Sequence, residues 1–183
     1  MASTFEKMNL KDQKQIVVVN APASFEPELR ALRGVTVLRD LGDVGEIEFL
    51  LAFVTTEKEV DTLGKIIARK AKGDAVVWFA YPKGTSKKYK SEIGRDNGWR
   101  VLGACGFECV RAVAIDEDWS GARFRRVEFV KTMKRDKKHA MTAQGKARAG
   151  KKWSGGLGGR WPRRAENPGL HRAGDGPPPL RRG

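Results

Sequence analysis

The run Ile16-Val17-Val18-Val19, followed at once by Asn20-Ala21-Pro22, is the stretch that decides the fold class. Four consecutive apolar residues, all branched at Cβ, are typical of a strand that is buried on both faces of a parallel sheet. Pro22 has no amide proton with which to continue the sheet, so it ends the strand. The sequence therefore predicts an α/β protein whose first strand lies inside a parallel sheet.

Similar apolar runs follow this strand, and helical patterns separate most of them. Strands are predicted at residues 35–38, 47–54, 75–81, 107–115 and 124–130, and helices at residues 24–32, after Thr56 as far as Gly73, and at residues 91–104. The order β-α-β-β-α-β-α-β-β predicts a Rossmann-like, doubly wound and mostly parallel sheet with helices on both faces. No helix separates the last two strands, so we expect the last strand to be antiparallel to its neighbour.

Two helix starts carry capping residues. Thr56 is followed three residues later by Glu59, which is the spacing of a capping box. Ser24 precedes a short amphipathic pattern that contains Leu29 and Leu32, so it is predicted to be the N-cap of the first helix.

The 183 residues fall into two parts that differ in charge. Residues 1–130 hold 21 basic and 19 acidic side chains, a net charge of +2, whereas the remaining residues hold 15 and 3, a net charge of +12. Beyond Lys131 the apolar pattern fades, and Gly, Pro, Arg, Ala and Trp dominate the last 31 residues. We therefore predict a Rossmann-like domain at residues 1–134 and a basic, largely disordered tail at residues 135–183.

The composition excludes several classes of protein. No stretch approaches the roughly 18 to 20 apolar residues that a membrane span needs, so no membrane partner is expected. Residues 1–10 lack the apolar core of a signal peptide, which favours a cytoplasmic location with Cys105 and Cys109 as free thiols. The oligomeric state is not encoded in any recognisable pattern.

Ligands of open α/β sheets bind beyond the carboxyl ends of the strands, so the residues that close each predicted strand are candidate site residues. We expect them to lie along one edge of the sheet. The eight candidates are Asn20, Asp40, Tyr81, Lys83, Thr85, Ser86, Lys87 and Asp116.

The loop at residues 83–90 indicates the chemical class of the ligand. It carries four lysines, two hydroxyl groups and a glycine, which together suit a phosphate group or another small anion. The spacing of a Walker loop is absent. The alternative is a solvated lysine loop, or one that matches the charge of the acidic string at residues 116–118.

No catalytic constellation or metal site has a recognisable spacing. Residues 1–130 contain no histidine, so neither a Ser-His-Asp triad nor a Cys-His pair is encoded in the domain. The acids at residues 116–118 lack an EF-hand pattern, and no metal site is predicted. The sequence leaves open whether the protein is an enzyme.

The middle of the chain resembles the second half of a class I S-adenosylmethionine-dependent methyltransferase. The match rests on Lys72-Gly73-Asp74 before the fourth strand, Pro82 after it, and Gly106-Phe107-Glu108 at the fifth. More specifically, residues 16–130 resemble an uncharacterised bacterial family of shortened methyltransferase-like domains. The residues that carry this resemblance are Val19-Asn20-Ala21-Pro22, Tyr81-Pro82-Lys83 and the string from Asp116 to Ser120. This resemblance implies a fold and brings no established activity.

The residues that follow the first strand do not decide whether the protein binds a cofactor. S-Adenosylmethionine is the cofactor of the resembling fold, and Asp40 lies 20 residues after Asn20, where a ribose-binding acid is expected. However, the first turn contains no glycine, and Pro22 removes an amide donor. We expect a protein of unknown function that binds a small anionic or phosphorylated ligand. The alternatives are a methyltransferase-like enzyme and a protein that contacts nucleic acid nonspecifically through its basic tail.

Overall fold

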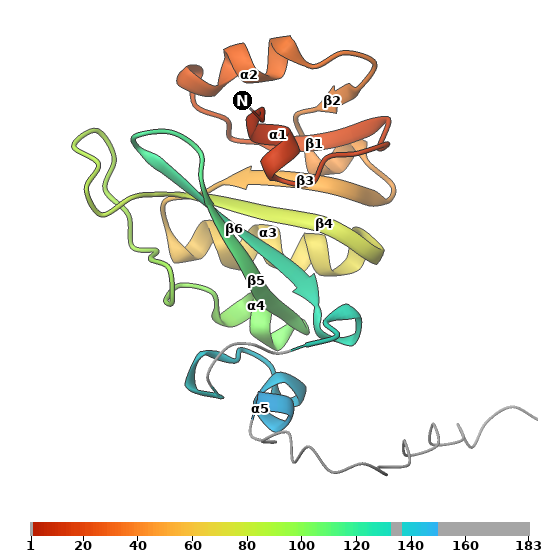
Figure 1. Ribbon diagram of the computed structural model, residues 1–183, viewed down its shortest axis with the longest axis vertical. Helices are drawn as coiled ribbons and strands as arrows, with labels where there is room; N and C mark the ends of the chain where they lie inside the picture. The colour runs from red at the N-terminus through yellow and green to blue at the C-terminus, as the bar shows by residue number, and fades with distance from the viewer. Residues whose placement is uncertain (1, 133–136, 150–183) are drawn as a thin grey trace, which may run out of the picture. The chain divides into compact units, whose positions relative to one another are not determined.

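Strand β1 (Gln15–Val19) forms where the β-branched run predicts it, and it lies inside a six-stranded sheet of the order β2-β1-β3-β4-β6-β5. The computed structural model describes residues 2–132 and 137–149, all within the compact unit of residues 1–152 (Figure 1). The other strands are β2 (Thr36–Leu38), β3 (Ile47–Phe53), β4 (Ala71–Pro82), β5 (Phe107–Ala114) and β6 (Trp119–Arg126).

The strand pairing confirms a mostly parallel sheet with an antiparallel last strand. β1 pairs in parallel with β2 and β3, and β3 pairs in parallel with β4. β6 is antiparallel to both β4 and β5, so β5 runs in the same direction as β4. The carboxyl ends of β1 to β5 therefore lie at one edge of the sheet, as the candidate site requires.

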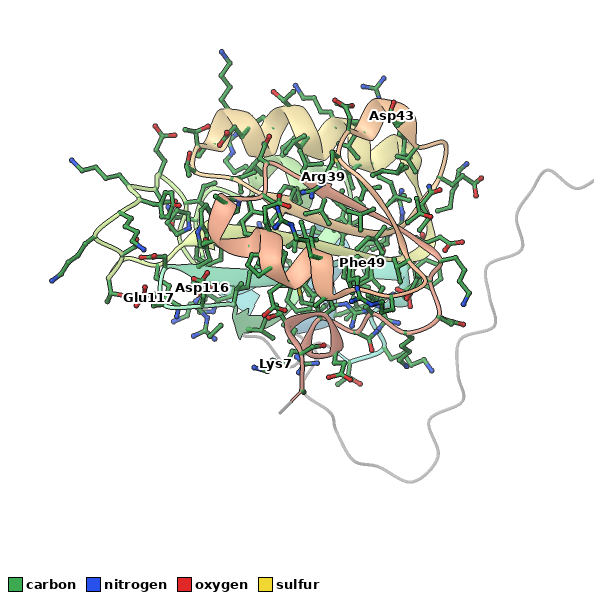
Figure 2. The ribbon with its side chains drawn as sticks, turned by 90° about the horizontal axis from the view of Figure 1, so that it is seen from above. Lys7, Arg39, Asp43, Phe49, Asp116 and Glu117 are labelled. Atoms are coloured by element: carbon green, nitrogen blue, oxygen red, sulfur yellow. The ribbon has the colours of Figure 1, made fainter. Side chains whose placement is uncertain are left out.

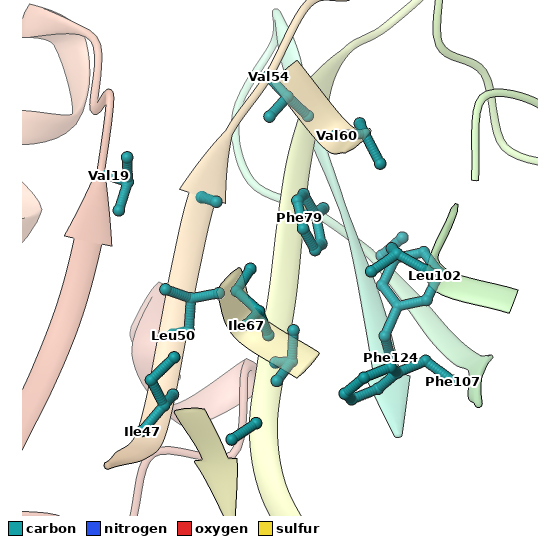
Figure 3. Packing of buried hydrophobic residues seen from close by; sticks show 14 of the residues in the cluster. Val19, Ile47, Leu50, Val54, Val60, Ile67, Phe79, Leu102, Phe107 and Phe124 are labelled. Carbon is teal, nitrogen blue, oxygen red and sulfur yellow. The ribbon is translucent and has the colours of Figure 1, made fainter. Parts of the chain in front are cut away.

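Helices cover both faces of the sheet, which confirms the doubly wound, Rossmann-like α/β fold. On one face lie α3 (Glu57–Lys70) and α4 (Arg100–Ala104), whose Val60, Ile67 and Leu102 are fully buried against the strands (Figure 3). On the other face lie α1 (Thr4–Lys7), η1 (Ala23–Phe25) and α2 (Glu26–Ala31), which contribute Phe5 and other apolar side chains to a second cluster. Short 3-10 turns η2 (Leu41–Asp43) and η3 (Val127–Phe129) complete the domain.

The helix α3 is capped as its sequence predicts. The Thr56 hydroxyl accepts a hydrogen bond from the Glu59 amide, and the Glu59 carboxylate accepts one from the Thr56 amide at 3.0 Å. Burial alone raises the pKa of Glu59, but the backbone amides and hydroxyls of Thr55 and Thr56 outweigh it and hold that pKa below its usual value. Both residues of the predicted capping box thus act as expected.

Four of the predicted element boundaries are wrong. The helix predicted as far as Gly73 ends at Lys70, and β4 begins directly after it at Ala71. The Ser24 side chain caps nothing, because η1 precedes α2 and moves the N-cap to Phe25. The predicted helix at residues 91–104 is helical only in its last turn, α4. The last strand begins at Trp119 and ends at Arg126, so residues predicted as a turn belong to β6.

Residues 137–149 fall within the predicted tail, yet they form η4 (Lys137–His139) and α5 (Ala143–Ala149). Glu108 of β5 is completely buried, and its carboxylate accepts hydrogen bonds from the Met141 and Thr142 amides and from the Thr142 hydroxyl. Residues 150–183, with most of the expected tail, lie outside the described residues. No helix within the described ranges has the length and apolarity that would let it cross a membrane.

Candidate functional site

A cavity of about 740 Å³ opens at the carboxyl end of β4, and four of the eight predicted site residues line it. They are Tyr81, Lys83, Thr85 and Ser86, and a fifth, Asp116, contacts Lys83. The cavity also takes in residues that are not among the eight candidates, which come from the loop after β4 and from the start of β6. They are Tyr89, Lys90, Ser91, Ile93, Gly94, Arg95 and Ser120.

The loop after β4 and the turn between β5 and β6 are tied together by hydrogen bonds. Lys83 donates from its amide to the Asp118 carbonyl (2.7 Å) and from Nζ to the Asp116 carbonyl (2.5 Å). The Ser86 hydroxyl donates to Asp118 Oδ1 at 2.8 Å. These bonds fix the Lys83 ammonium and the Ser86 hydroxyl at the wall of the cavity.

The Asp116 carboxylate shapes its own turn. Its Oδ1 accepts hydrogen bonds from the amides of Asp118 and Trp119, each at 2.8 Å. Asp116 and Glu117 lie side by side on this turn, as Figure 2 shows. The contact of Asp116 with the cavity therefore runs through its backbone carbonyl, which holds Lys83, and not through its carboxylate.

The charge on the cavity wall is wholly positive among the lining residues. Lys83, Lys90 and Arg95 contribute cations, and no aspartate or glutamate lines the cavity. Within the described residues, neither Lys90 nor Arg95 forms a salt bridge. A concave surface with this charge attracts an anion and favours charge-assisted hydrogen bonds to it.

The other lysines of the loop interact elsewhere. Lys88 lies 3.4 Å from Asp118 and 3.9 Å from Glu117, and its hydrogen bond to Asp118 holds the Lys88 pKa above its usual value. Lys87 is exposed and is not among the residues that line the cavity. A charge match between the loop and the acidic string, which the sequence offered as an alternative to ligand binding, is thus made by Lys88.

Asn20 and Asp40 lie at the same edge of the sheet but outside this cavity. Asn20 has a left-handed backbone, with φ of 57°, and its Nδ2 donates to the Phe53 carbonyl at 3.4 Å. The Asp40 carboxylate accepts a hydrogen bond of 2.6 Å from the Gly42 amide and so begins the turn η2. Both side chains are engaged by their own chain.

These residues do not fit an adenosyl cofactor held in the usual manner at the end of β1. An asparagine makes the tight turn where a glycine would let the backbone approach the cofactor closely. Pro22, which follows, offers no amide donor. Asp40, the acid predicted to bind the ribose hydroxyls, already caps its own turn. No other described residue at this end of β1 takes that predicted role.

Lys90, Arg95 and Ser120 line the cavity but are not among the eight candidates. Lys90 ends the loop at residues 83–90 whose lysines the sequence assigns to an anion, whereas Arg95 lies within residues 91–104, where the pattern predicts a helix rather than a cavity wall. Ser120 falls in a predicted turn, but it belongs to β6 and pairs with Tyr81 of β4. Only this antiparallel pairing, which links residues far apart in the sequence, brings Ser120 to the cavity.

The acidic string at residues 116–118 does not form a metal centre. Among residues 2–132 and 137–149, no group of three or more His, Cys, Asp or Glu side chains is arranged to hold a metal ion. The two cysteines in this part of the chain are free thiols, and Cys109 is buried.

The strand order and pairing define a Rossmann-like α/β fold, and comparisons with known proteins add resemblances of fold. No protein-family model and no curated protein matches the chain. A solved S-adenosylmethionine-dependent methyltransferase from Aquifex aeolicus is 15% identical, with a TM-score of 0.46 over 67% of this chain and 87% of that one. The Methanococcus jannaschii fibrillarin pre-rRNA processing protein is also 15% identical, with a TM-score of 0.43 over 63% and 67%.

A third similar structure is magnesium protoporphyrin IX methyltransferase from Synechocystis, at 12% identity and a TM-score of 0.40 over 67% of this chain and 74% of that one. The expected resemblance to methyltransferases is therefore present among solved structures. The fold assignment itself rests on the sheet of this chain, and no activity is taken from these matches.

Proposed function

We propose that the protein binds a small anionic or phosphorylated ligand in the cavity at the carboxyl end of β4. The observation that carries this proposal is the lining of that cavity, which holds Lys83, Lys90 and Arg95 and no acidic side chain. An anion in this cavity would gain charge-assisted hydrogen bonds without repulsion from a lining carboxylate.

The roles of the side chains follow from their present partners. Lys83 is fixed by the Asp116 carbonyl and retains two further N–H donors, so it positions one edge of the anion. Lys90 and Arg95 form no described salt bridge and supply the remaining charge. The Thr85, Ser91 and Ser120 hydroxyls line the same cavity and offer neutral donors.

Methyl transfer is the second function that this fold suggests, and the end of β1 supports it poorly, because its turn lacks a glycine and its polar side chains are already engaged. The binding experiment for the proposed function therefore includes S-adenosylmethionine. Nonspecific nucleic-acid contact through the basic tail concerns residues that lie mostly outside the described ones and stays a prediction.

The test is isothermal titration of the full-length protein with inorganic phosphate, 3-phosphoglycerate, pyrophosphate and S-adenosylmethionine. We expect a phosphorylated compound to bind, and Lys90→Ala to weaken that binding about tenfold, the effect of losing one charge-assisted contact. Lys58→Ala is the matched control, because Lys58 is an exposed lysine on α3 that lines no described cavity.

Two results would overturn the proposal. One is that none of the phosphorylated compounds binds. The other is that Lys90→Ala and Lys58→Ala weaken binding equally, which would mean that overall positive charge attracts the anion. Binding of S-adenosylmethionine alone, unaffected by Lys90→Ala, would instead favour the methyltransferase-like alternative.

A further inference from the structure

A second cavity, of about 780 Å³, lies beside the same irregular segment and is closed by residues that the sequence pattern assigns to the tail. One wall is made by residues 95–104, and the other by residues 138–146. Its volume lies in the range of about 300 to 1,000 Å³ that is usual for small-molecule sites. The proposed anionic-ligand site does not include this cavity, although Arg95 lines both.

The wall from residues 138–146 is held in place by buried contacts. Glu108 binds the Met141 and Thr142 amides, and the Gly103 position lies against the Met141 backbone, where an added Cβ would come within 2.8 Å of the Met141 carbonyl oxygen. The Thr142 hydroxyl accepts a hydrogen bond from the Gly145 amide at 2.8 Å. The second wall is thus positioned before any ligand arrives.

The interior of the cavity is largely apolar. Trp99 and Cys109 are each only 4% exposed, Ala140 is equally buried, and Met141 is half-buried. The Trp99 indole N–H donates to the Gly94 carbonyl at 2.9 Å, so this lining side chain presents no unsatisfied polar atom to the cavity. Such a floor suits a flat, weakly polar ring.

The rim of the cavity is rich in exposed cations from both walls. Arg95 and Arg100 come from one wall, and Lys138 and Lys146 from the other. Within the described residues, neither Arg100 nor Lys146 forms a salt bridge. Convergence of cations from two separate segments favours a ligand with a multiply charged anionic group, such as a phosphate.

Carboxylates of Glu57 and Asp96 also line the cavity and add hydrogen-bond acceptors. A ligand with an apolar ring, an anionic group and hydroxyl or amino donors would satisfy all three parts of the lining. We propose that this cavity is a binding site for a nucleoside monophosphate, with the phosphate at Arg100 and Lys146 and the base toward Trp99 and Met141.

The test is equilibrium binding of the full-length protein to the four common ribonucleoside monophosphates, one at a time. We expect at least one to bind, and the double variant Arg100→Ala/Lys146→Ala to weaken it by at least about tenfold. Inorganic phosphate and the matching nucleoside should each compete far more weakly than the monophosphate, because each fills only part of the cavity.

Lys90→Ala and Lys58→Ala should leave monophosphate binding within about twofold of the wild-type value. Lys90 lines only the strand-end cavity and Lys58 lines neither, and every variant keeps the basic residues beyond 149 unchanged. The proposal is overturned if no monophosphate binds, if the double variant binds as well as wild type, or if Lys58→Ala weakens binding equally. A loss on Lys90→Ala with none in the double variant would assign the nucleotide to the strand-end cavity and overturn this proposal alone.

Discussion

Glu108 is the residue on which the packing of residues 141–145 depends. Its carboxylate is completely buried and receives its described hydrogen bonds from backbone amides and one hydroxyl, with distances of 2.6 to 3.0 Å. An added Cβ at Gly145 would lie only 2.1 Å from Glu108 Oε1, so the helix α5 approaches this carboxylate very closely. A buried acceptor with this many donors stabilises the fold only while every donor finds an oxygen.

The substitution Glu108→Gln is therefore expected to destabilise the protein by about 1 to 3 kcal/mol, because the amide nitrogen that replaces one carboxylate oxygen faces the Met141 amide, which is itself a donor. Urea denaturation measures the change. Glu128→Gln is the control, since Glu128 is exposed and makes no described side-chain contact, and it should alter the free energy of unfolding by less than about 0.5 kcal/mol. Equal effects of the two substitutions would contradict the proposed role of Glu108.

The capping box at Thr56 and Glu59 leads to a prediction about pH. The pKa of Glu59 is lower in the folded protein than in the unfolded chain, so the ionised carboxylate stabilises the fold. That contribution is fully present above the ordinary Glu pKa of 4.5 and is lost as the pH falls through the lower folded-state pKa.

We expect Glu59→Gln to lower the free energy of unfolding by about 0.5 to 1 kcal/mol at pH 7, and the difference from wild type to shrink as the solution is acidified below pH 4.5. Urea denaturation at a series of pH values measures this difference. A difference that stays constant down to about pH 3 would show that the charge of Glu59 is irrelevant to the cap.

At the scale of elements, the strands and α3 were predictable and the segment at residues 91–99 was not. The apolar runs of β1 and β3 are local patterns, and so is the capping box of α3. In residues 91–99, by contrast, side chains compete with helix formation for backbone groups. The Ser91 hydroxyl accepts from the Ile93 amide, and Asn97 Nδ2 donates to the Glu92 carbonyl.

Gly98 completes this irregular segment with a left-handed backbone, at φ of 89°. A Cβ at this position would lie 3.0 Å from Ile93 Cγ1 as well as forcing an unfavourable conformation. Gly98→Ala is expected to lower the free energy of unfolding by about 1 to 2 kcal/mol. It should also weaken monophosphate binding, because Gly98 lines the second cavity.

Gly84→Ala provides the matched comparison for Gly98→Ala. Gly84 lies in the loop after β4, where an added Cβ meets nothing within 4 Å and the backbone is not left-handed. Denaturation of the two variants should give a change at Gly84 of no more than a few tenths of a kcal/mol. If both substitutions cost the same, the backbone of residues 91–99 is not constrained as the structure indicates.

The candidate site divides in the same way between local and long-range information. Tyr81, Lys83, Thr85 and Ser86 follow a predictable strand directly, so the rule that ligands bind at strand ends finds them. Ser120 needs the register of β6 on β4. The second cavity needs the contact between Glu108 and Thr142, which joins a strand to a segment that its composition assigns to the tail.

For the whole molecule, the contacts of residues 137–149 place the boundary of the folded unit later than residue 134. Arg148 donates to the Val127 and Val130 carbonyls, while the amides of residues 141 and 142 bind Glu108. Residues 137–149 therefore belong to the same compact unit as the sheet. Chains that end at Lys152 and at Thr132 therefore test whether residues 137–149 stabilise the fold.

A chain that ends at Lys152 should unfold at nearly the same temperature as the full-length protein. A chain that ends at Thr132 loses the donors to the buried Glu108 and the packing of Met141, so we expect its melting temperature to fall by at least about 4 °C, the equivalent of about 1 to 2 kcal/mol in a domain of this size. Differential scanning calorimetry gives both values.

The chain that ends at Thr132 should also lose monophosphate binding, because one wall of that cavity is gone. It should retain anion binding at Lys83 and Lys90, whose cavity includes no residue beyond Ser120. Equal melting temperatures for the two truncated chains would mean that residues 137–149 contribute nothing to the fold, and the role assigned to Glu108 would fall with them.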